Sequence, residues 1–259
     1  MLALIDGKSP EVSVEQKSPA SYVAEFLGTF FLVFAITLVV SLFVNPQGTG
    51  TDWAVVGLVH GFVLFLIVAT LGYVSGAHVN PAVTIAAMAL RTIRMSDGIV
   101  YILLQLAGAV AGALMTKFLL IDSLADQQNV GAVSLNFSLI SNSFAGVVAE
   151  GLGTFLLVWA VIGVAMNPRA NRAWEPLVIG TTLGFAVMIL GPLTGAALNP
   201  ARWFGPALVA NEWSDFWVWI IGPIVGGLLA AVSYWFLFVV ERPGWTIPGG
   251  PPAPDMDPD

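Results

Sequence analysis

Two copies of one short motif hold the residues best able to do chemistry in an otherwise apolar chain. Residues 75–84 are Ser-Gly-Ala-His-Val-Asn-Pro-Ala-Val-Thr, and residues 194–203 are Thr-Gly-Ala-Ala-Leu-Asn-Pro-Ala-Arg-Trp. We call the Asn-Pro-Ala tripeptides at 80–82 and 199–201 the first and second box. Asparagine is a strong helix N-cap, and proline is favoured at the first helical position. Each box therefore predicts a helix that begins at its proline.

These two helices must lie within a membrane. The 259-residue chain is 57% apolar and only 10% charged, which is outside the range of ordinary soluble domains. A helix of about eleven residues spans about 16 Å, which is half of a hydrocarbon layer about 30 Å thick. Non-helical backbone at that depth persists only where it is buried in protein or lines a wet cavity. The two motifs therefore predict a pore or a binding site at mid-membrane.

Six longer apolar segments are expected to cross the membrane and hold the two half-helices. They cover approximately residues 20–44, 53–73, 98–121, 144–166, 175–193 and 216–240. The sequence around Glu25 recurs around Glu150, and the glycine pairs 57/61 and 108/112 recur as 180/184 and 222/226. Because each half has three crossings, the second half enters from the opposite side, as in inverted-repeat transporters. The predicted fold class is an all-α membrane protein with six transmembrane helices and two re-entrant half-helices in an inverted repeat.

The predicted domain organisation follows from this repeat. We expect a flexible cytoplasmic N-terminus at 1–18, a first repeat at 19–121, an extracellular loop at 122–141, a second, inverted repeat at 142–242, and a disordered Pro- and Asp-rich tail at 243–259. Lys and Arg concentrate on one side of this topology, which places both termini in the cytoplasm. We expect a multi-pass protein of the plasma membrane.

The twin boxes, with Arg202 directly after the second, resemble the aquaporin or major intrinsic protein family, over roughly residues 18–242. The resemblance implies a passive water channel that excludes protons and ions, assembled as a homotetramer with one pore in each protomer. It implies no enzymatic activity and no cofactor. The absence of cysteine and the presence of only two histidines do not favour a metal site, and the scattered basic residues give no support for nucleic-acid binding.

Asn80 and Asn199 are predicted to form the pore centre. Each has one carbonyl acceptor and two uncharged N–H donors, so the carbonyl can serve its own loop while the amide binds a permeating oxygen. Two such donors would orient a water molecule, and the positive helix ends would repel cations. A purely structural cap is the alternative.

The resemblance assigns a selectivity filter to His60, Val187, Ala196 and Arg202. Water-selective relatives usually carry Phe and His at the first two of these positions, so His60 with Val187 resembles the wider filters of plant vacuolar members. The filter is therefore expected to admit water and small neutral solutes such as ammonia, urea, hydrogen peroxide or glycerol. The competing roles are helix packing for His60 and a headgroup contact for Arg202.

Five further residues are predicted to line or support the pore. The resemblance places Leu32 and Leu157 beside the asparagine pair and has Glu25 and Glu150 accept hydrogen bonds from the re-entrant loops. His78 is an anchor, a gate at the cytoplasmic mouth or a pore ligand. The competing roles are core packing for the leucines and a proton relay for the glutamates.

Some features depart from this picture. Relatives usually have Ser or Asp at the position of Trp203, whereas Ala207 and the pair Tyr234-Trp235 favour the water-conducting type. The main rival function is a coupled secondary transporter, which also uses inverted repeats and would need Glu25 or Glu150 in its path. Two further rivals are an intramembrane enzyme that uses a histidine and a purely structural membrane protein.

Overall fold

Every regular element in the described part of the chain is helical. The computed structural model describes residues 16–44, 51–167 and 170–240. Its α-helices are α1 Pro19–Phe43, α2 Trp53–Ser75, α3 Pro81–Ala89, α4 Met95–Leu119, α5 Asp122–Gln127, α6 Ser143–Val161, α7 Glu175–Thr194, α8 Pro200–Ala210 and α9 Val218–Trp235. The π-helical turns Ile162–Met166 and Phe236–Val240 extend α6 and α9. Short 3₁₀ turns cover Asn129–Gly131 and Arg172–Trp174.

Six helices in the described residues are long and apolar enough to cross a membrane. They are α1, α2, α4, α6, α7 and α9, and the two short helices α3 and α8 begin at the prolines of the boxes. This confirms the predicted fold class. The largest difference at a helix start is at α4, predicted from residue 98 but observed from Met95.

Local chemistry sets several helix boundaries. The side chains of Ser18, Asp52 and Asn142 accept a backbone N–H in the first turns of α1, α2 and α6. Helices α2 and α7 each end at a glycine in the left-handed conformation, Gly76 with φ 94° and Gly195 with φ 75°. The chain therefore turns sharply out of each long helix just before each box.

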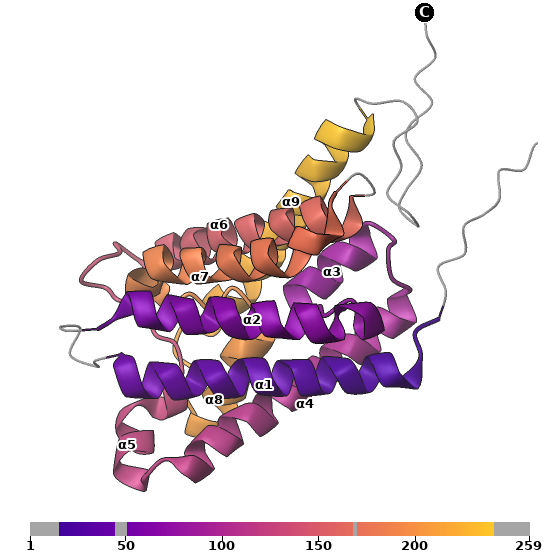
Figure 1. The fold of residues 1–259 in the computed structure, drawn as a ribbon. Coiled ribbons are helices and arrows are strands. Elements are labelled where there is room, and N and C mark those ends of the chain that lie inside the picture. Colours follow the sequence, from indigo (N-terminus) through magenta and orange to yellow (C-terminus); the bar gives the residue numbers. More distant parts are fainter. Residues whose placement is uncertain (1–15, 45–50, 168–169, 241–259) are drawn as a thin grey trace, which may run out of the picture.

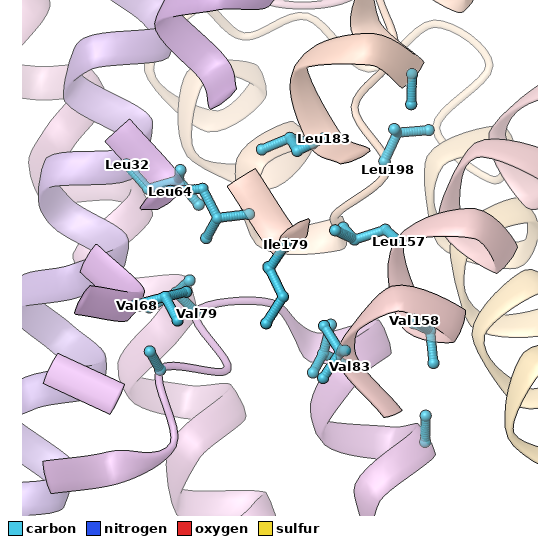
Figure 2. Packing of buried hydrophobic residues seen from close by; sticks show 14 of the residues in the cluster. Leu32, Leu64, Val68, Val79, Val83, Leu157, Val158, Ile179, Leu183 and Leu198 are labelled. Carbon is cyan, nitrogen blue, oxygen red and sulfur yellow. The ribbon is translucent and has the colours of Figure 1, made fainter. Parts of the chain in front are cut away.

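The long helices form a bundle around the two half-helices (Figure 1). Helix α2 packs along α7, α1 along α4, and α6 along α9. At the α2–α7 crossing a Cβ added to Gly57 would lie 2.7 Å from the Gly184 carbonyl oxygen, and the reverse distance is also 2.7 Å. Only glycine allows the two backbones to approach this closely. The interior is an apolar cluster drawn from both halves of the chain (Figure 2).

The segment 122–141, predicted as a polar loop, is in part folded. It contains α5 and a turn in which Val130 and Gly131 are buried. Gly131 has φ 70° and packs on α1, where an added Cβ would lie 2.7 Å from the Thr37 carbonyl oxygen. The loop is therefore fixed against the bundle.

The end of the predicted flexible N-terminus is also held. The backbone N–H of Lys17 donates to Asp97 at 3.1 Å, and its Nζ donates to the Ser75 carbonyl at 3.4 Å. The rest of that segment, residues 1–15, and the predicted tail at 243–259 lie outside the described residues.

Candidate functional site

The two boxes meet at the centre of the bundle, each asparagine capping its own half-helix. The Oδ1 atom of Asn80 accepts from the Ala82 N–H at 2.9 Å, and Oδ1 of Asn199 accepts from the N–H groups of Ala201 and Arg202 at 2.9 and 3.2 Å. Each side-chain carbonyl therefore serves its own helix N-terminus.

The amide groups cross between the two repeats. Nδ2 of Asn80 donates to the Leu198 carbonyl at 2.9 Å, and Nδ2 of Asn199 donates to the Val79 carbonyl at 2.9 Å. The sequence led us to expect that each amide points into the lumen and binds a permeating oxygen. In the structure, one N–H of each amide ties the half-helices together, and one is left for a ligand.

Glu25, on α1, organises the first loop. It is fully buried; its Oε1 accepts from the Ser75 hydroxyl at 2.7 Å and the His78 N–H at 2.9 Å. Its Oε2 accepts from the Val79 N–H at 2.8 Å and from Nε2 of Gln105 at 2.7 Å. The carboxylate is thus held by four donors, as a buried charge requires.

Glu150, on α6, has the same role in the second loop. It is also fully buried, and it accepts from the Thr194 hydroxyl at 2.6 Å, the Ala197 N–H at 3.0 Å and the Leu198 N–H at 2.7 Å. These bonds hold both loops in a backbone conformation that is unfavourable for residues other than glycine. The left-handed residues are Ala77, Val79, Ala196 and Leu198, with φ of 46°, 41°, 45° and 50°.

A narrow cavity of about 30 Å³ runs past the asparagine pair, large enough for about two water molecules. Its wall is mostly apolar and includes the predicted residues Leu32 and Leu157, while His78 and Arg202 add polar atoms. The lining residues are Leu32, Ile36, Leu64, Gly76, Ala77, His78, Val79, Asn80, Val83, Leu157, Val161, Ile179, Leu183, Ala197, Asn199 and Arg202. Figure 2 shows several of these leucine, isoleucine and valine side chains converging from α1, α2, α6 and α7.

A second, wider cavity of about 780 Å³ lies on the side where α1 ends, and Arg202 lines both cavities. The other predicted filter residues line neither: His60 is 1% exposed, and Val187 and Ala196 are 0% exposed. Val187 and Ala196 share a buried cluster with Val56, whose carbonyl holds His60. The three residues His60, Val187 and Ala196 therefore lie in the packed interior and not on the wall of either cavity.

Arg202 and His60 have buried polar atoms without a hydrogen-bond partner among the described residues. Nη1 of Arg202 donates to the Gly131 carbonyl at 3.1 Å, whereas its Nε and Nη2 are buried and have no partner among the residues that the structure describes. Nδ1 of His60 lies 2.7 Å from the Val56 carbonyl, which can only accept, so the neutral ring carries its hydrogen on Nδ1. Its Nε2 is a buried acceptor that has no partner in the described part of the chain. Together the two side chains hold two unpaired donor atoms and one unpaired acceptor atom.

Trp203 has a structural explanation in the internal repeat. Trp203 occupies the last position of the second motif, as Thr84 occupies the last position of the first motif, and the Trp203 side chain is 6% exposed. Behind α3, Thr84 bonds to Gln105, whereas behind α8, Trp203 packs in an apolar cluster with Trp219. Gln105 and Trp219 precede corresponding glycines, 108 and 222. The two repeats therefore support their half-helices with different chemistry.

Several supporting residues were not predicted. The hydroxyls of Ser75 and Thr194 accept from the N–H groups of Ala77 and Ala196, and their carbonyls accept from Tyr101 and Trp219. Ser75 and Thr194 occupy the first position of both motifs, so their shared hydroxyl was a usable signal. The Gly131 carbonyl, which accepts from Arg202, could not be recognised in the sequence, because every residue has a backbone carbonyl.

Comparison with known proteins agrees with this geometry. Residues 13–234 match the family model described as major intrinsic protein. The chain is 36% identical over 243 residues to Aquaporin AqpM of Methanothermobacter thermautotrophicus, covering 83% of this chain and 96% of that protein. It is 36% identical over 242 residues to Aquaporin TIP4-4 of Zea mays, covering 91% of each chain.

A solved structure shares the fold. The X-ray structure of the aquaglyceroporin from Plasmodium falciparum superposes with a TM-score of 0.70 at 24% identity, covering 83% of this chain and 94% of that one. The chain therefore belongs to the major intrinsic protein family of integral membrane channels, as the twin boxes led us to expect.

Proposed function

We propose that the protein is a passive channel that conducts water in single file past Asn80 and Asn199. The observation that carries this proposal is the pair of crossed amide bonds, because they bring two helix N-termini tip to tip beside a cavity of water width. The apolar wall leaves a water molecule few partners other than the asparagine amides and the loop carbonyls. The apolar wall thus confines the hydrogen bonds of the passing water to these few groups.

The same centre supports exclusion of protons and ions. Each asparagine has one N–H left for the lumen, so a central water accepts two hydrogen bonds and is poorly placed to pass a proton on. The N-termini of α3 and α8 add partial positive charge, and Arg202 adds a full one. Cations therefore meet repulsion at two levels of the path.

We also propose that small neutral solutes pass, including ammonia, urea, hydrogen peroxide and glycerol. Arg202 supplies two free donors and His60 one free acceptor, which suits a solute that both accepts and donates hydrogen bonds. Because His60, Val187 and Ala196 are at most 1% exposed, the Arg202 or His60 side chain must move to admit a permeating molecule between them, and must move further for a solute wider than water. Larger solutes should therefore pass more slowly than water.

The position of the acids favours a channel over a coupled transporter. A proton-coupled carrier needs an ionisable acid in its path. Glu25 and Glu150, the two candidates, are fully buried, are bonded to the loops and do not line the central cavity. They therefore act as supports in this proposal.

Stopped-flow light scattering on proteoliposomes tests the proposal with water, urea, glycerol and ammonia in turn. We expect water flux well above that of bare liposomes, proportional to the gradient and independent of a proton gradient. Urea flux equal to that of bare lipid would reject the wider solute range. Saturable, proton-dependent flux would instead favour the transporter.

Orientation and location are part of the proposal. Lys17, Arg91, Arg94 and Arg172 lie at or beyond helix ends on the side where α1 begins, so we place that side and both termini in the cytoplasm of a plasma membrane protein. Protease access to a C-terminal tag in sealed cells and in lysed cells tests this assignment.

We propose a homotetramer with one pore in each protomer. The outer faces of α6 and α7 enclose an open groove of about 560 Å³ lined by Leu156, Trp159 and Phe185, among others, which suits helix packing against another copy. Native mass spectrometry of the protein released from detergent measures the number of copies. A monomer that conducts water would reject the tetramer and leave the proposed channel function standing.

A further inference from the structure

A chain of polar side chains reaches from His78 into the protein behind α3. Nδ1 of His78 lies 3.1 Å from the Thr84 hydroxyl oxygen. The same hydroxyl oxygen lies 3.1 Å from the backbone carbonyl oxygen of Asn80 and 3.0 Å from Nε2 of Gln105. That Nε2 also donates to Glu25 at 2.7 Å, which fixes the orientation of the Gln105 amide, because a carboxylate accepts.

These contacts determine where the hydrogens lie. A threonine hydroxyl has one hydrogen and two lone pairs. The Asn80 carbonyl can only accept, so it takes the hydroxyl hydrogen, and the Gln105 amide can only donate, so it occupies one lone pair. The remaining lone pair is free to accept from Nδ1 of His78. The neutral His78 ring then carries its hydrogen on Nδ1, and its Nε2 is a bare acceptor.

We propose that Thr84 is a positioning residue that holds His78 in the Nδ1–H tautomer, so that Nε2 accepts a hydrogen bond from the permeating molecule. This inference rests on the proposed function, since His78 lines the same cavity as the asparagine pair. His60 is held in the same tautomer by the Val56 carbonyl. The path then has a histidine acceptor on each side of the central donors.

The second repeat lacks this device. Ala197 stands where His78 stands in the first motif, and Trp203 stands where Thr84 does. Charged and titratable groups surround His78. Its backbone N–H donates to Glu25, its ring packs edge-on to Tyr101 with the ring centroids 5.5 Å apart, and Lys17 bonds to the carbonyl of Ser75 in the same motif. Arg202 is a further charged group, because it lines the same cavity.

The ¹⁵N NMR spectrum of histidine-labelled protein in bilayers tests the tautomer directly, because the chain has only two histidines. A His78→Asn variant identifies the His78 signal. We expect Nδ1–H in the wild type and in Thr84→Ser. Thr84→Val should shift the tautomer ratio about fivefold toward Nε2–H, the effect of losing about one net hydrogen bond. A wild-type His78 in the Nε2–H form, or an unchanged ratio in Thr84→Val, would overturn the assignment.

Water flux between pH 5 and pH 8 tests the consequence for permeation. We expect Thr84→Val to lower water flux by at most about fivefold and to change its pH profile, while Thr84→Ser retains both. Thr154→Val is the matched control, since Thr154 is fully buried and its hydroxyl has no partner within the described residues. A Thr84→Val channel identical to the control would overturn the positioning role. Absence of water flux in the wild type would reject the proposed function, whereas the NMR experiment would still test the tautomer of His78.

Discussion

Asn80→Asp isolates the role of the central amides. The two side chains have nearly the same shape, and Asp caps a helix as well as Asn, so α3 should still begin at Pro81. The carboxylate cannot donate to the Leu198 carbonyl, 2.9 Å from Nδ2 in the wild type. Leaving that buried acceptor unpaired costs about 1–3 kcal/mol of folding stability.

The larger effect concerns selectivity. A cation passing within about 4 Å of the new charge gains about 4 kcal/mol at an effective dielectric constant of about 20. Since about 1.4 kcal/mol is a factor of ten, cation entry should rise about a thousandfold. Proton and sodium leak into proteoliposomes, followed with a pH-sensitive dye and a sodium electrode, measures this rise.

A matched control separates charge at the pore from charge elsewhere. Asn142 also caps a helix, accepting from the Ala145 N–H at 3.0 Å, but it is exposed at the start of α6. Asn142→Asp should conduct water normally and remain tight to protons. An Asn80→Asp channel that conducts water and is as proton-tight as this control would refute our reasoning about the central donors.

Three other predictions follow from the same structure. Arg202→Val should raise urea and glycerol flux in stopped-flow assays, because it removes the side chain shared by both cavities, and an unchanged solute series would place the filter elsewhere. Gly226→Ala should lower the free energy of unfolding by about 1–3 kcal/mol, because the added methyl group would meet the Gly151 backbone. Gly163→Ala is the control, because a Cβ there has no neighbour closer than 3.8 Å in the part of the chain that the structure describes. Equal melting temperatures of the two variants in detergent would contradict this prediction. The wild type has no cysteine, so its water flux should resist mercurials, and strong inhibition would count against the proposed lining.

The architecture could be predicted because local signals and the internal repeat agree. Asn-Pro fixes the start of each half-helix through capping and proline chemistry, and the apolar length of the spans fixes the rest. The repeat then required the two boxes to meet. Leu32 and Leu157, which line the central cavity, were named only through the family resemblance, and other lining residues such as Ile36 and Ile179 were not named.

The parts that could not be predicted depend on contacts between distant segments. Nothing in the sequence shows that Asn80 donates to the carbonyl of Leu198, or that Arg202 is held by a carbonyl in the segment 122–141. Backbone carbonyls have no sequence signature, so such partners emerge only in three dimensions. The polar composition of that segment indicated a loop but not the buried turn at Gly131.

Cysteine scanning of neighbouring residues on α6 tests the central claim, that water passes beside the asparagine pair. Leu157 lines the cavity and is 3% exposed, whereas Val158 is 1% exposed and does not line it; Figure 2 shows Leu157 beside Ile179, with Val158 set apart. The natural chain has no cysteine to interfere. We predict that a mercurial blocks water flux through Leu157→Cys and spares Val158→Cys. Equal block of both variants, or flux through Leu157→Cys that the reagent does not change, would contradict the account.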